Sequence, residues 1–315
     1  MVAVFFNAVA AVVVLLLLML VGYCLGRAGW MGGSEKKFLG KYIMNIAVPC
    51  NCLVGLLNNL DRSMLSEAGV MVAAAMLGVA TNFVLGMILA TLLKLPKNRW
   101  GVFVPMVGLS NTLFIGMPLS TQLFGEVCLP YVMVYYMSST MFTQSVAVML
   151  IERAGRGGSG KRSVAGFLKD VFTKPPIVAT FLTIIMLLLG VRPPEVVMSF
   201  AKYISSSVSS LALLYCGYIV YELGLRNIRF ERGIPIMIFC RLVVAPLICV
   251  GYCRLFGITG LAHDVMVVES ALPVVSQITV MAGNFGADDK YAATGATLST
   301  IGCFFTIPVL MVLLG

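Results

Sequence analysis

Ten apolar stretches follow one another along the 315 residues, separated only by short polar breaks. Each is close to the roughly 20 residues that a helix needs to cross a bilayer. The chain is 60% hydrophobic and 11% charged, with a mean hydropathy of +0.99, which lies outside the balance of a soluble domain. We therefore predict an all-α, multi-pass membrane protein. The predicted spans are 4–26, 38–58, 68–94, 99–124, 127–151, 175–191, 195–222, 233–256, 261–286 and 290–314.

The basic residues predict how these spans are oriented. Most of the 22 Lys and Arg residues fall in or beside the odd-numbered connections. Only Arg62, Arg192, Lys202 and Arg254 lie in or beside the even-numbered ones. Because cytoplasmic loops carry the excess of positive charge, the odd connections are expected in the cytoplasm and both termini outside. The net charge of +9 then reflects topology rather than nucleic-acid binding.

A Gly/Ser/Arg/Lys-rich linker divides the chain into two halves of five spans each. We assign residues 1–151 to the first repeat, 152–174 to a cytoplasmic basic linker and 175–315 to the second repeat. An odd number of spans per half makes the second half enter the membrane from the opposite side, so any structural repeat is inverted. A shift of 161 residues aligns the span boundaries and places Thr112 on Pro273.

The fourth span is interrupted by polar residues and helix breakers at membrane depth. Ser110, Asn111 and Thr112 offer side-chain donors and acceptors, and Gly116 and Pro118 weaken the helical hydrogen-bond ladder that follows. Broken backbone inside a bilayer is tolerated only where protein or a wet cavity covers it. Such an interruption predicts a cavity rather than a lipid-facing helix.

The ninth span carries the matching interruption. Pro273 removes a backbone donor, and Ser276 and Gln277 supply polar side chains. A pair of interrupted segments, one in each half, is the best sequence indication of a transporter's substrate site. Where the two broken helices cross, helix N-termini favour an anion and carbonyl ends favour a cation. Packing between membrane helices also uses Ser, Thr and Pro and is the competing explanation.

Three further polar residues lie within spans. Glu269 precedes Pro273 by one turn, and Arg241 lies inside the eighth span. Charges at this depth are costly and usually functional, so the two form either a buried ion pair or part of a coupling or substrate site. Asn45, beside Pro49 in the second span, is a candidate for the same cavity or for core packing.

Several chemistries lack the residues they need. The chain has one histidine, and its nine cysteines are scattered through apolar stretches without zinc-ligand spacing. It has no phosphate-binding loop and no nucleophile elbow around Ser110. We therefore expect no enzyme activity, no metal site and no cofactor, with H⁺ or Na⁺ as the candidate coupling ion.

At these residues the sequence resembles the auxin efflux carrier family, which includes plant PIN-type auxin carriers and bacterial malate or malonate permeases. Where the plant carriers have a proline before the matching asparagine, this chain has Ser110, which leaves open how the fourth span breaks. The stretches that carry the resemblance are Ser110 to Pro118, Leu123-Phe124-Gly125, Lys174-Pro175-Pro176-Ile177, Arg241-Leu242 with Pro246, Ala271-Leu272-Pro273 and Leu298-Ser299-Thr300 with Pro308.

The resemblance implies an NhaA-like inverted-repeat fold in which the broken fourth and ninth helices cross at the substrate site. It also implies a scaffold of the first, second, sixth and seventh helices, an elevator-like movement of the remaining helices against it, and a homodimer built through the scaffold. The absence of a long central loop is typical of the compact bacterial members, which places the chain in a bacterial inner (plasma) membrane.

The sequence thus predicts a secondary transporter of a small organic anion, such as a dicarboxylate or an auxin-like carboxylate, that works by alternating access. Two alternatives remain open: a carrier of a bulkier hydrophobic or steroid-like anion on the same fold, and a membrane sensor or receptor that moves no substrate. The predicted substrate-binding residues are Ser110, Asn111, Thr112, Pro273, Ser276, Gln277 and Asn45.

Overall fold

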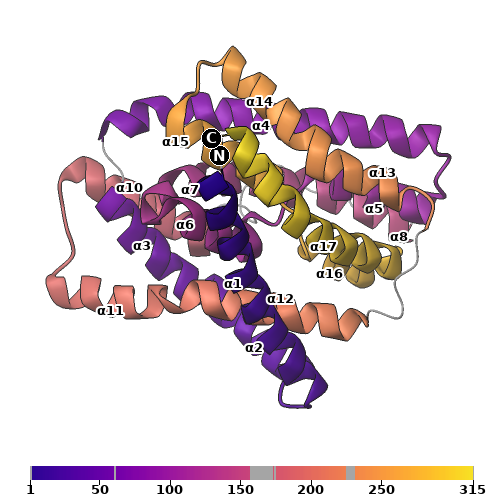
Figure 1. The fold of residues 1–315 in the computed structure, drawn as a ribbon, viewed down its shortest axis with the longest axis horizontal. Helices are drawn as coiled ribbons and strands as arrows, with labels where there is room; N and C mark the ends of the chain where they lie inside the picture. The colour runs from indigo at the N-terminus through magenta and orange to yellow at the C-terminus, as the bar shows by residue number, and fades with distance from the viewer. Residues whose placement is uncertain (1, 60–61, 157–172, 174, 225–230, 315) are drawn as a thin grey trace.

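The protein is described from a computed structural model that covers residues 2–59, 62–156, 173, 175–224 and 231–314. These residues form helices joined by short turns and contain no β-strand (Figure 1). The expectation of an all-helical membrane protein is confirmed. Most of the predicted basic linker and Lys174 lie outside the described residues.

The helices of the first half follow the predicted spans closely. They are α1 (Val2–Arg27), α2 (Gly33–Tyr42), α3 (Val48–Asn59), α4 (Arg62–Leu92), α5 (Lys97–Gly108), α6 (Met117–Phe124), α7 (Leu129–Phe142) and α8 (Val148–Arg156). Short π-helical turns lie at Ile43–Ala47, Thr112–Gly116 and Thr143–Ala147. The first of these contains Asn45 and continues α2 into α3, so the second predicted span is one helix with a widened turn just before Pro49.

The second half also consists of helices, with a π-helical turn inside its eighth predicted span. Its helices are α10 (Pro175–Leu189), α11 (Glu195–Ser205), α12 (Ser207–Leu223), α13 (Ile234–Phe239), α14 (Ala245–Leu255), α15 (Gly260–Ser270), α16 (Gln277–Phe285) and α17 (Asp289–Leu314). A π-helical turn at Cys240–Val244 joins α13 to α14 and contains Arg241.

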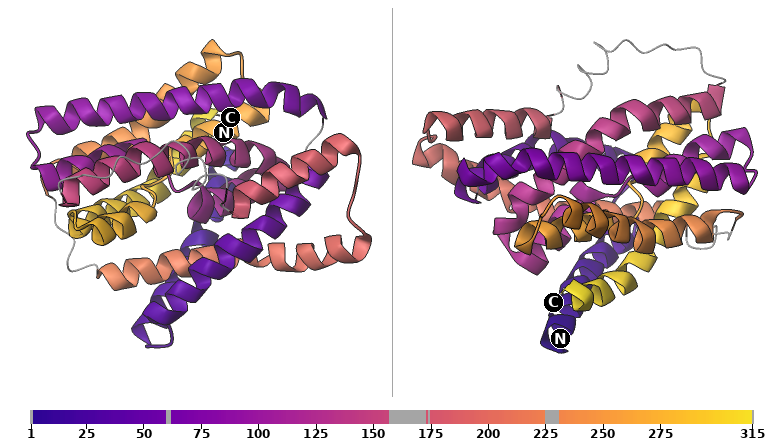
Figure 2. Two further views of the ribbon diagram at one scale, coloured as in Figure 1. Left: turned by 180° about the vertical axis from the view of Figure 1, so that it is seen from behind. Right: turned by 90° about the horizontal axis from the view of Figure 1, so that it is seen from above.

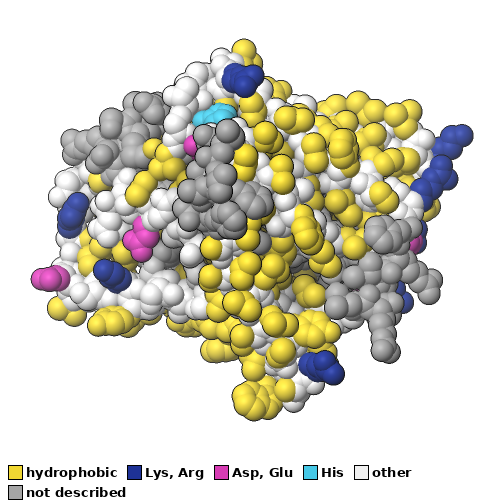
Figure 3. Space-filling view, viewed as in Figure 1, with side chains coloured by type: hydrophobic (Ala, Val, Ile, Leu, Met, Phe, Trp, Pro, Cys, Tyr) yellow, Lys and Arg dark blue, Asp and Glu magenta, His cyan; other side chains and the backbone are white. Residues whose placement is uncertain are grey.

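Five of the described helical stretches are long and apolar enough to cross a membrane by length and composition. They are Gly33–Asn59, Ala68–Leu92, Glu195–Glu222, Ile234–Leu255 and Asp289–Leu314. Shorter apolar helices cover Val13–Arg27, Thr112–Phe124 and Pro175–Leu189. On the face drawn in Figure 3, hydrophobic side chains cover the middle of the surface while Lys and Arg lie mostly at its margins. The ten-span inverted repeat stays a prediction.

The helices pack in two groups. One contains α1, α2, α3, α10, α11 and α12, with α1 against α12 and α3 against α10 and α11. In the other, α4 packs on α5, α7 and α14, α5 packs on α8, and α16 lies between α8 and α17 (Figure 2). Contacts of α1 with α17 and of α3 with α7 join the groups. The start of α1 and the end of α17 lie side by side (Figure 1).

Among the described glycines, the closest approach to another helix is made by Gly217 of α12 to α1. A Cβ atom added to Gly217 of α12 would lie 1.8 Å from the carbonyl oxygen of Met19 in α1. Real Cβ atoms do not come that close to backbone, so only glycine allows this separation. Small residues that bring two backbones together are a common way of associating helices in membranes.

Gly217→Ala should therefore destabilise the protein. The added methyl group has to push two helix backbones apart, and overpacking of this kind costs typically about 1–3 kcal/mol. The measurement is thermal unfolding of the purified protein in detergent. Gly251→Ala in α14 is the matched control, because a Cβ there meets open space and alanine favours a helix over glycine. Equal melting temperatures of the two variants would contradict the proposed contact.

Candidate functional site

The fourth predicted span is interrupted at Leu109 to Asn111. Helix α5 contains Pro105 and ends at Gly108, and Leu109 then takes an extended conformation, with φ −115° and ψ 131°. The chain returns to a helix at Thr112, where the N–H groups of Ile115 and Gly116 donate to the carbonyl of Asn111 at 3.3 and 3.0 Å. The break therefore lies before Gly116 and Pro118, which fall inside helical turns.

The ninth predicted span is interrupted between α15, which ends at Ser270, and α16, which begins at Gln277. The two interruptions meet. The N–H of Asn111 donates to the carbonyl of Pro273 at 2.8 Å, and Ser110 and Val274 form an isolated antiparallel bridge. The N–H of Val274 donates to the Ser299 hydroxyl of α17 at 3.1 Å. The broken backbones thus satisfy each other instead of facing lipid.

This pairing leaves two carbonyl groups without their usual helical donors. In an uninterrupted helix the N–H of Asn111 would bond the carbonyl of Val107, and that of Val274 would bond the carbonyl of Ser270. Both N–H groups are engaged elsewhere. The carbonyls at the ends of α5 and α15 therefore need other partners.

Arg241 supplies both partners. Its guanidinium donates from Nη1 to the Val107 carbonyl at 2.9 Å and from Nη2 to the Ser270 carbonyl. The side chain is fully buried. Its positive charge also lies where the C-terminal ends of two helices concentrate negative charge. Arg241 thus caps the first halves of both broken helices at once.

The polar side chains of the interruption point to a single place. Asn111 Nδ2 lies 3.4 Å from the Ser276 hydroxyl. Asn111 Oδ1 and Ser110 Oγ are buried and have no hydrogen-bond partner. Unpaired buried polar atoms are unusual in native structures and call for an explanation, and a polar ligand at this point would supply the missing partners.

A cavity of about 620 Å³ leads to this place from one end of the molecule. Its inner end is lined by Ser110, Asn111, Thr112, Ser276 and Gln277, together with Asn45 from the widened turn of the second span. The structure thus brings six of the seven predicted substrate-binding residues to one cavity. Pro273 takes part through its carbonyl group and does not line the cavity.

The outer part of the cavity contains residues that sequence reasoning did not single out. Lys36, Lys37 and Lys41 of α2 line its mouth, where Lys36 forms an ion pair with Glu222 of α12. Tyr136, Ser139, Thr140 and Thr143 of the fifth predicted span and Tyr215 of α12 line the wall. A local excess of lysines raises the concentration of anions at a cavity mouth. Only the lysines carried a sequence signal, as part of a basic cluster.

Glu269 lies outside the cavity and is fully buried. Its Oε1 accepts a hydrogen bond from the Ser120 hydroxyl at 2.7 Å, while Oε2 has no partner. A Cβ atom on Gly116 would lie 2.3 Å from Oε2, so glycine at this position makes room for the carboxyl group. Although both residues are described, no ion pair joins Glu269 to Arg241 within 4 Å. The described residues also hold no cluster of metal-ligating side chains.

Comparison with known proteins identifies the family of this chain. The family model described as membrane transport protein, which corresponds to the auxin efflux carriers, matches residues 7–311. The chain belongs to this family. An uncharacterized transporter of Methanocaldococcus jannaschii is 25% identical over 293 residues, which are 92% of this chain and 93% of that protein. An uncharacterized transporter of Methanothermobacter thermautotrophicus is 24% identical over 316 residues, 99% and 100% of the two chains.

A longer relative is also similar to this chain. The lysosomal cholesterol signaling protein of Mus musculus is 22% identical over 321 residues, which cover 94% of this chain and 36% of that protein. Family membership confirms a multi-pass membrane protein of the transport class.

Arg241→Met should destabilise the fold strongly. It leaves the Val107 and Ser270 carbonyls buried without a donor, and each unsatisfied buried group costs about 1–3 kcal/mol. Thermal unfolding in detergent measures the loss. The matched control is Arg254→Met at the exposed end of α14, which should leave the melting temperature nearly unchanged. If both variants unfold at the same temperature, Arg241 does not hold the two helix ends.

Proposed function

We propose that the protein is a secondary transporter of a small organic anion, with its substrate site where the two broken helices meet. One observation carries the proposal: a cavity with lysines at its mouth ends at Asn111 and Ser110, and the buried Ser110 hydroxyl has no hydrogen-bond partner. A carboxylate entering this cavity meets positive charge first and then the Asn111 amide and the Ser110 and Ser276 hydroxyls as donors.

The orientation of the cavity fits the charge distribution. Lys36, Lys37 and Lys41 belong to the first predicted cytoplasmic connection and line the cavity mouth. The cavity therefore opens to the cytoplasm in an inward-open state, and both termini lie outside a bacterial inner membrane. Alternating access then requires the group of helices that contains α5 and α16 to move in an elevator-like step. The group that contains α1 and α12 is the homodimeric scaffold against which it moves.

Asn111→Ala tests the substrate site. Removing the amide should weaken binding of a dicarboxylate about 10- to 100-fold, because a hydrogen bond to a charged group contributes about 1.5–3 kcal/mol. Uptake of labelled malonate into proteoliposomes, together with binding to the purified protein, measures the change. Asn58→Ala is the control, since Asn58 is exposed at the far end of α3.

The outcomes separate the alternatives. Unchanged uptake by Asn111→Ala would reject the site. Binding without counterflow would favour the sensor or receptor, and a response only to bulky hydrophobic anions would favour the other carrier.

Of the two candidate coupling ions, we favour the proton. The Asn111 carbonyl, which a sodium site in the break would use, already accepts two backbone hydrogen bonds. Glu269 has one carboxyl oxygen without a partner and packs against Gly116, just beyond the break. An ionised carboxylate without a nearby cation is costly in such a place, so loading and unloading a proton there changes the free energy of the surrounding helices.

Glu269→Gln should remove the pH dependence of transport. A glutamine keeps the shape of the protonated acid and releases no proton, so uptake driven by a pH gradient should fall to the rate without one. Malonate uptake at several external pH values measures this, with the exposed Glu126→Gln as control. A retained pH response, or a requirement for Na⁺ in the unmodified protein, would reject proton coupling through Glu269.

A further inference from the structure

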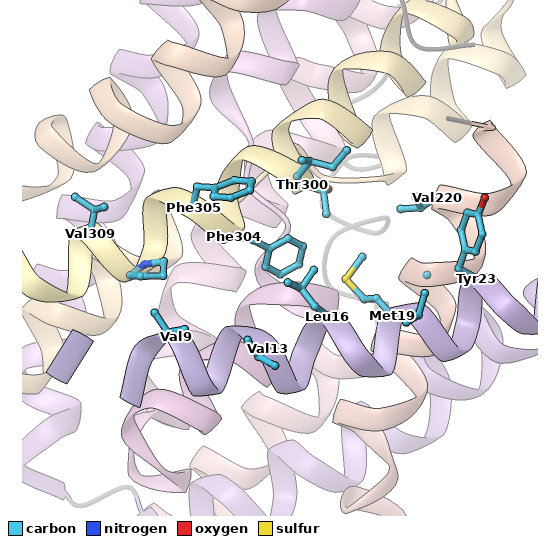
Figure 4. A pocket seen from close by; sticks show the side chains of 14 residues that line it. Val9, Val13, Leu16, Met19, Tyr23, Val220, Thr300, Phe304, Phe305 and Val309 are labelled. Atoms are coloured by element: carbon cyan, nitrogen blue, oxygen red, sulfur yellow. The ribbon is translucent and has the colours of Figure 1, made fainter. Parts of the chain in front are cut away.

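A second large hollow lies among exposed apolar side chains of α1 and α17. This groove has a volume of about 560 Å³ and runs between the two helices, with Val220 of α12 at its end near Tyr23 (Figure 4). Its walls are almost entirely apolar, and Leu16, Phe304 and Phe305 are among them. Such a surface in a membrane protein contacts lipid, so its apolar character alone identifies no ligand.

The groove lies next to the proposed substrate site. A small hollow of about 10 Å³ has Met19, Val220 and Thr300 in common with the groove. It has Ser276 and Ala296 in common with the cavity that ends at Asn111. The small hollow therefore lies between the groove and the substrate cavity, with these shared side chains as its walls, and it has room for about one water molecule.

A polar group without a partner lies at this constriction. Thr297 lines the small hollow, its side chain is 3% exposed, and its hydroxyl has no hydrogen-bond partner. Leaving a buried hydroxyl unpaired is unfavourable. Ser276 and Thr300 line the same hollow among apolar neighbours, so three hydroxyl side chains lie at the constriction. Such a lining suits a polar head group or the water that accompanies it.

The walls differ in their freedom to move. The close approach of Gly217 to the Met19 backbone fixes α1 against α12. The Met19 side chain, which lines both the groove and the constriction, is unbranched and adopts many shapes. No comparable backbone approach is made by a glycine of α17 to α1 or α12 among the described residues. A wider constriction would require another Met19 rotamer or a shift of α17, because the α1–α12 wall is closely packed.

We propose that the groove is a lateral entrance from the bilayer, and that it binds the apolar tail of an amphipathic carboxylate whose head group reaches Ser276 and Asn111 through the constriction. This inference rests on the proposed function and narrows its substrate class. The labelled groove residues Val9 and Tyr23 of α1 (Figure 4) are about 21 Å apart along a helix that rises 1.5 Å per residue. An extended tail of a medium- or long-chain acid fits along this length.

The experiment compares dodecanoate binding among variants in phosphatidylcholine nanodiscs. Thr300→Phe and Val220→Phe each narrow the constriction from a different helix. Asn111→Ala removes the head-group partner. Leu255→Phe adds the same side chain at an exposed position of α14 that lines none of the three hollows. We expect all but the Leu255 variant to weaken dodecanoate binding at least 10-fold, while malonate binding changes in Asn111→Ala only.

The other outcomes overturn the lateral entrance. If Thr300→Phe and Val220→Phe bind dodecanoate with the same affinity as the unmodified protein, its tail does not lie in the groove. If these two variants weaken dodecanoate binding but Asn111→Ala does not, the groove holds only a bilayer lipid tail. No dodecanoate binding at all also rejects the entrance. In each of these cases the proposed function still stands if the unmodified protein binds malonate and Asn111→Ala weakens that binding. If the unmodified protein does not bind malonate, the proposed function itself is rejected. Unchanged malonate binding by the two Phe variants verifies that they are folded.

Discussion

The hydrogen bond from the Asn111 N–H to the Pro273 carbonyl is the interaction on which the rest of the site depends. Inside a bilayer, water does not satisfy a broken backbone, so each interruption would be prohibitive alone. Two interruptions that meet can satisfy one another, and the bridge between Ser110 and Val274 does this. The pairing takes the Asn111 N–H away from the Val107 carbonyl, and the Ser299 hydroxyl takes the Val274 N–H away from the Ser270 carbonyl, so the buried Arg241 guanidinium becomes necessary.

This chain of requirements explains why a full positive charge is kept in an apolar interior. Arg241 is fully buried, and no carboxylate forms an ion pair with it among the described residues. Its partners are instead the negative ends of two helices, which act as fixed partial charges. A guanidinium suits the task because its planar fork presents several donors in fixed directions. The cation stabilises the neighbouring ends of α5 and α15 and leaves the polar side chains of the break free for a ligand.

Sequence reasoning located the interruptions because polar residues at membrane depth are costly enough to be rare. The same physics identified Ser110, Asn111, Ser276 and Gln277, which the structure places on one cavity. It did not give the role of Arg241, because a sequence shows that a charge is buried but not which group faces it. An ion pair with Glu269 was one alternative, whereas the structure gives backbone carbonyls. The lining by Tyr136 and Tyr215 was equally hidden, since tyrosine within an apolar span is common and carries no signal.

The position of the first break shows the limit of reading helix breakers literally. Gly116 and Pro118 are helix breakers that follow the polar residues of the fourth span, yet both lie in helical turns, and the chain opens at Leu109 to Asn111. Pro118 falls at the second position of α6, where the missing N–H does little harm, and Gly116 provides space for the Glu269 carboxyl group. Tertiary pairing with the ninth span, rather than local propensity, decides where the helix opens. The helix therefore opens at Ser110 without a proline at that position. The backbone of the partner segment, Pro273 and Val274, pairs with the backbone of Ser110 and Asn111 in place of the helical hydrogen bonds.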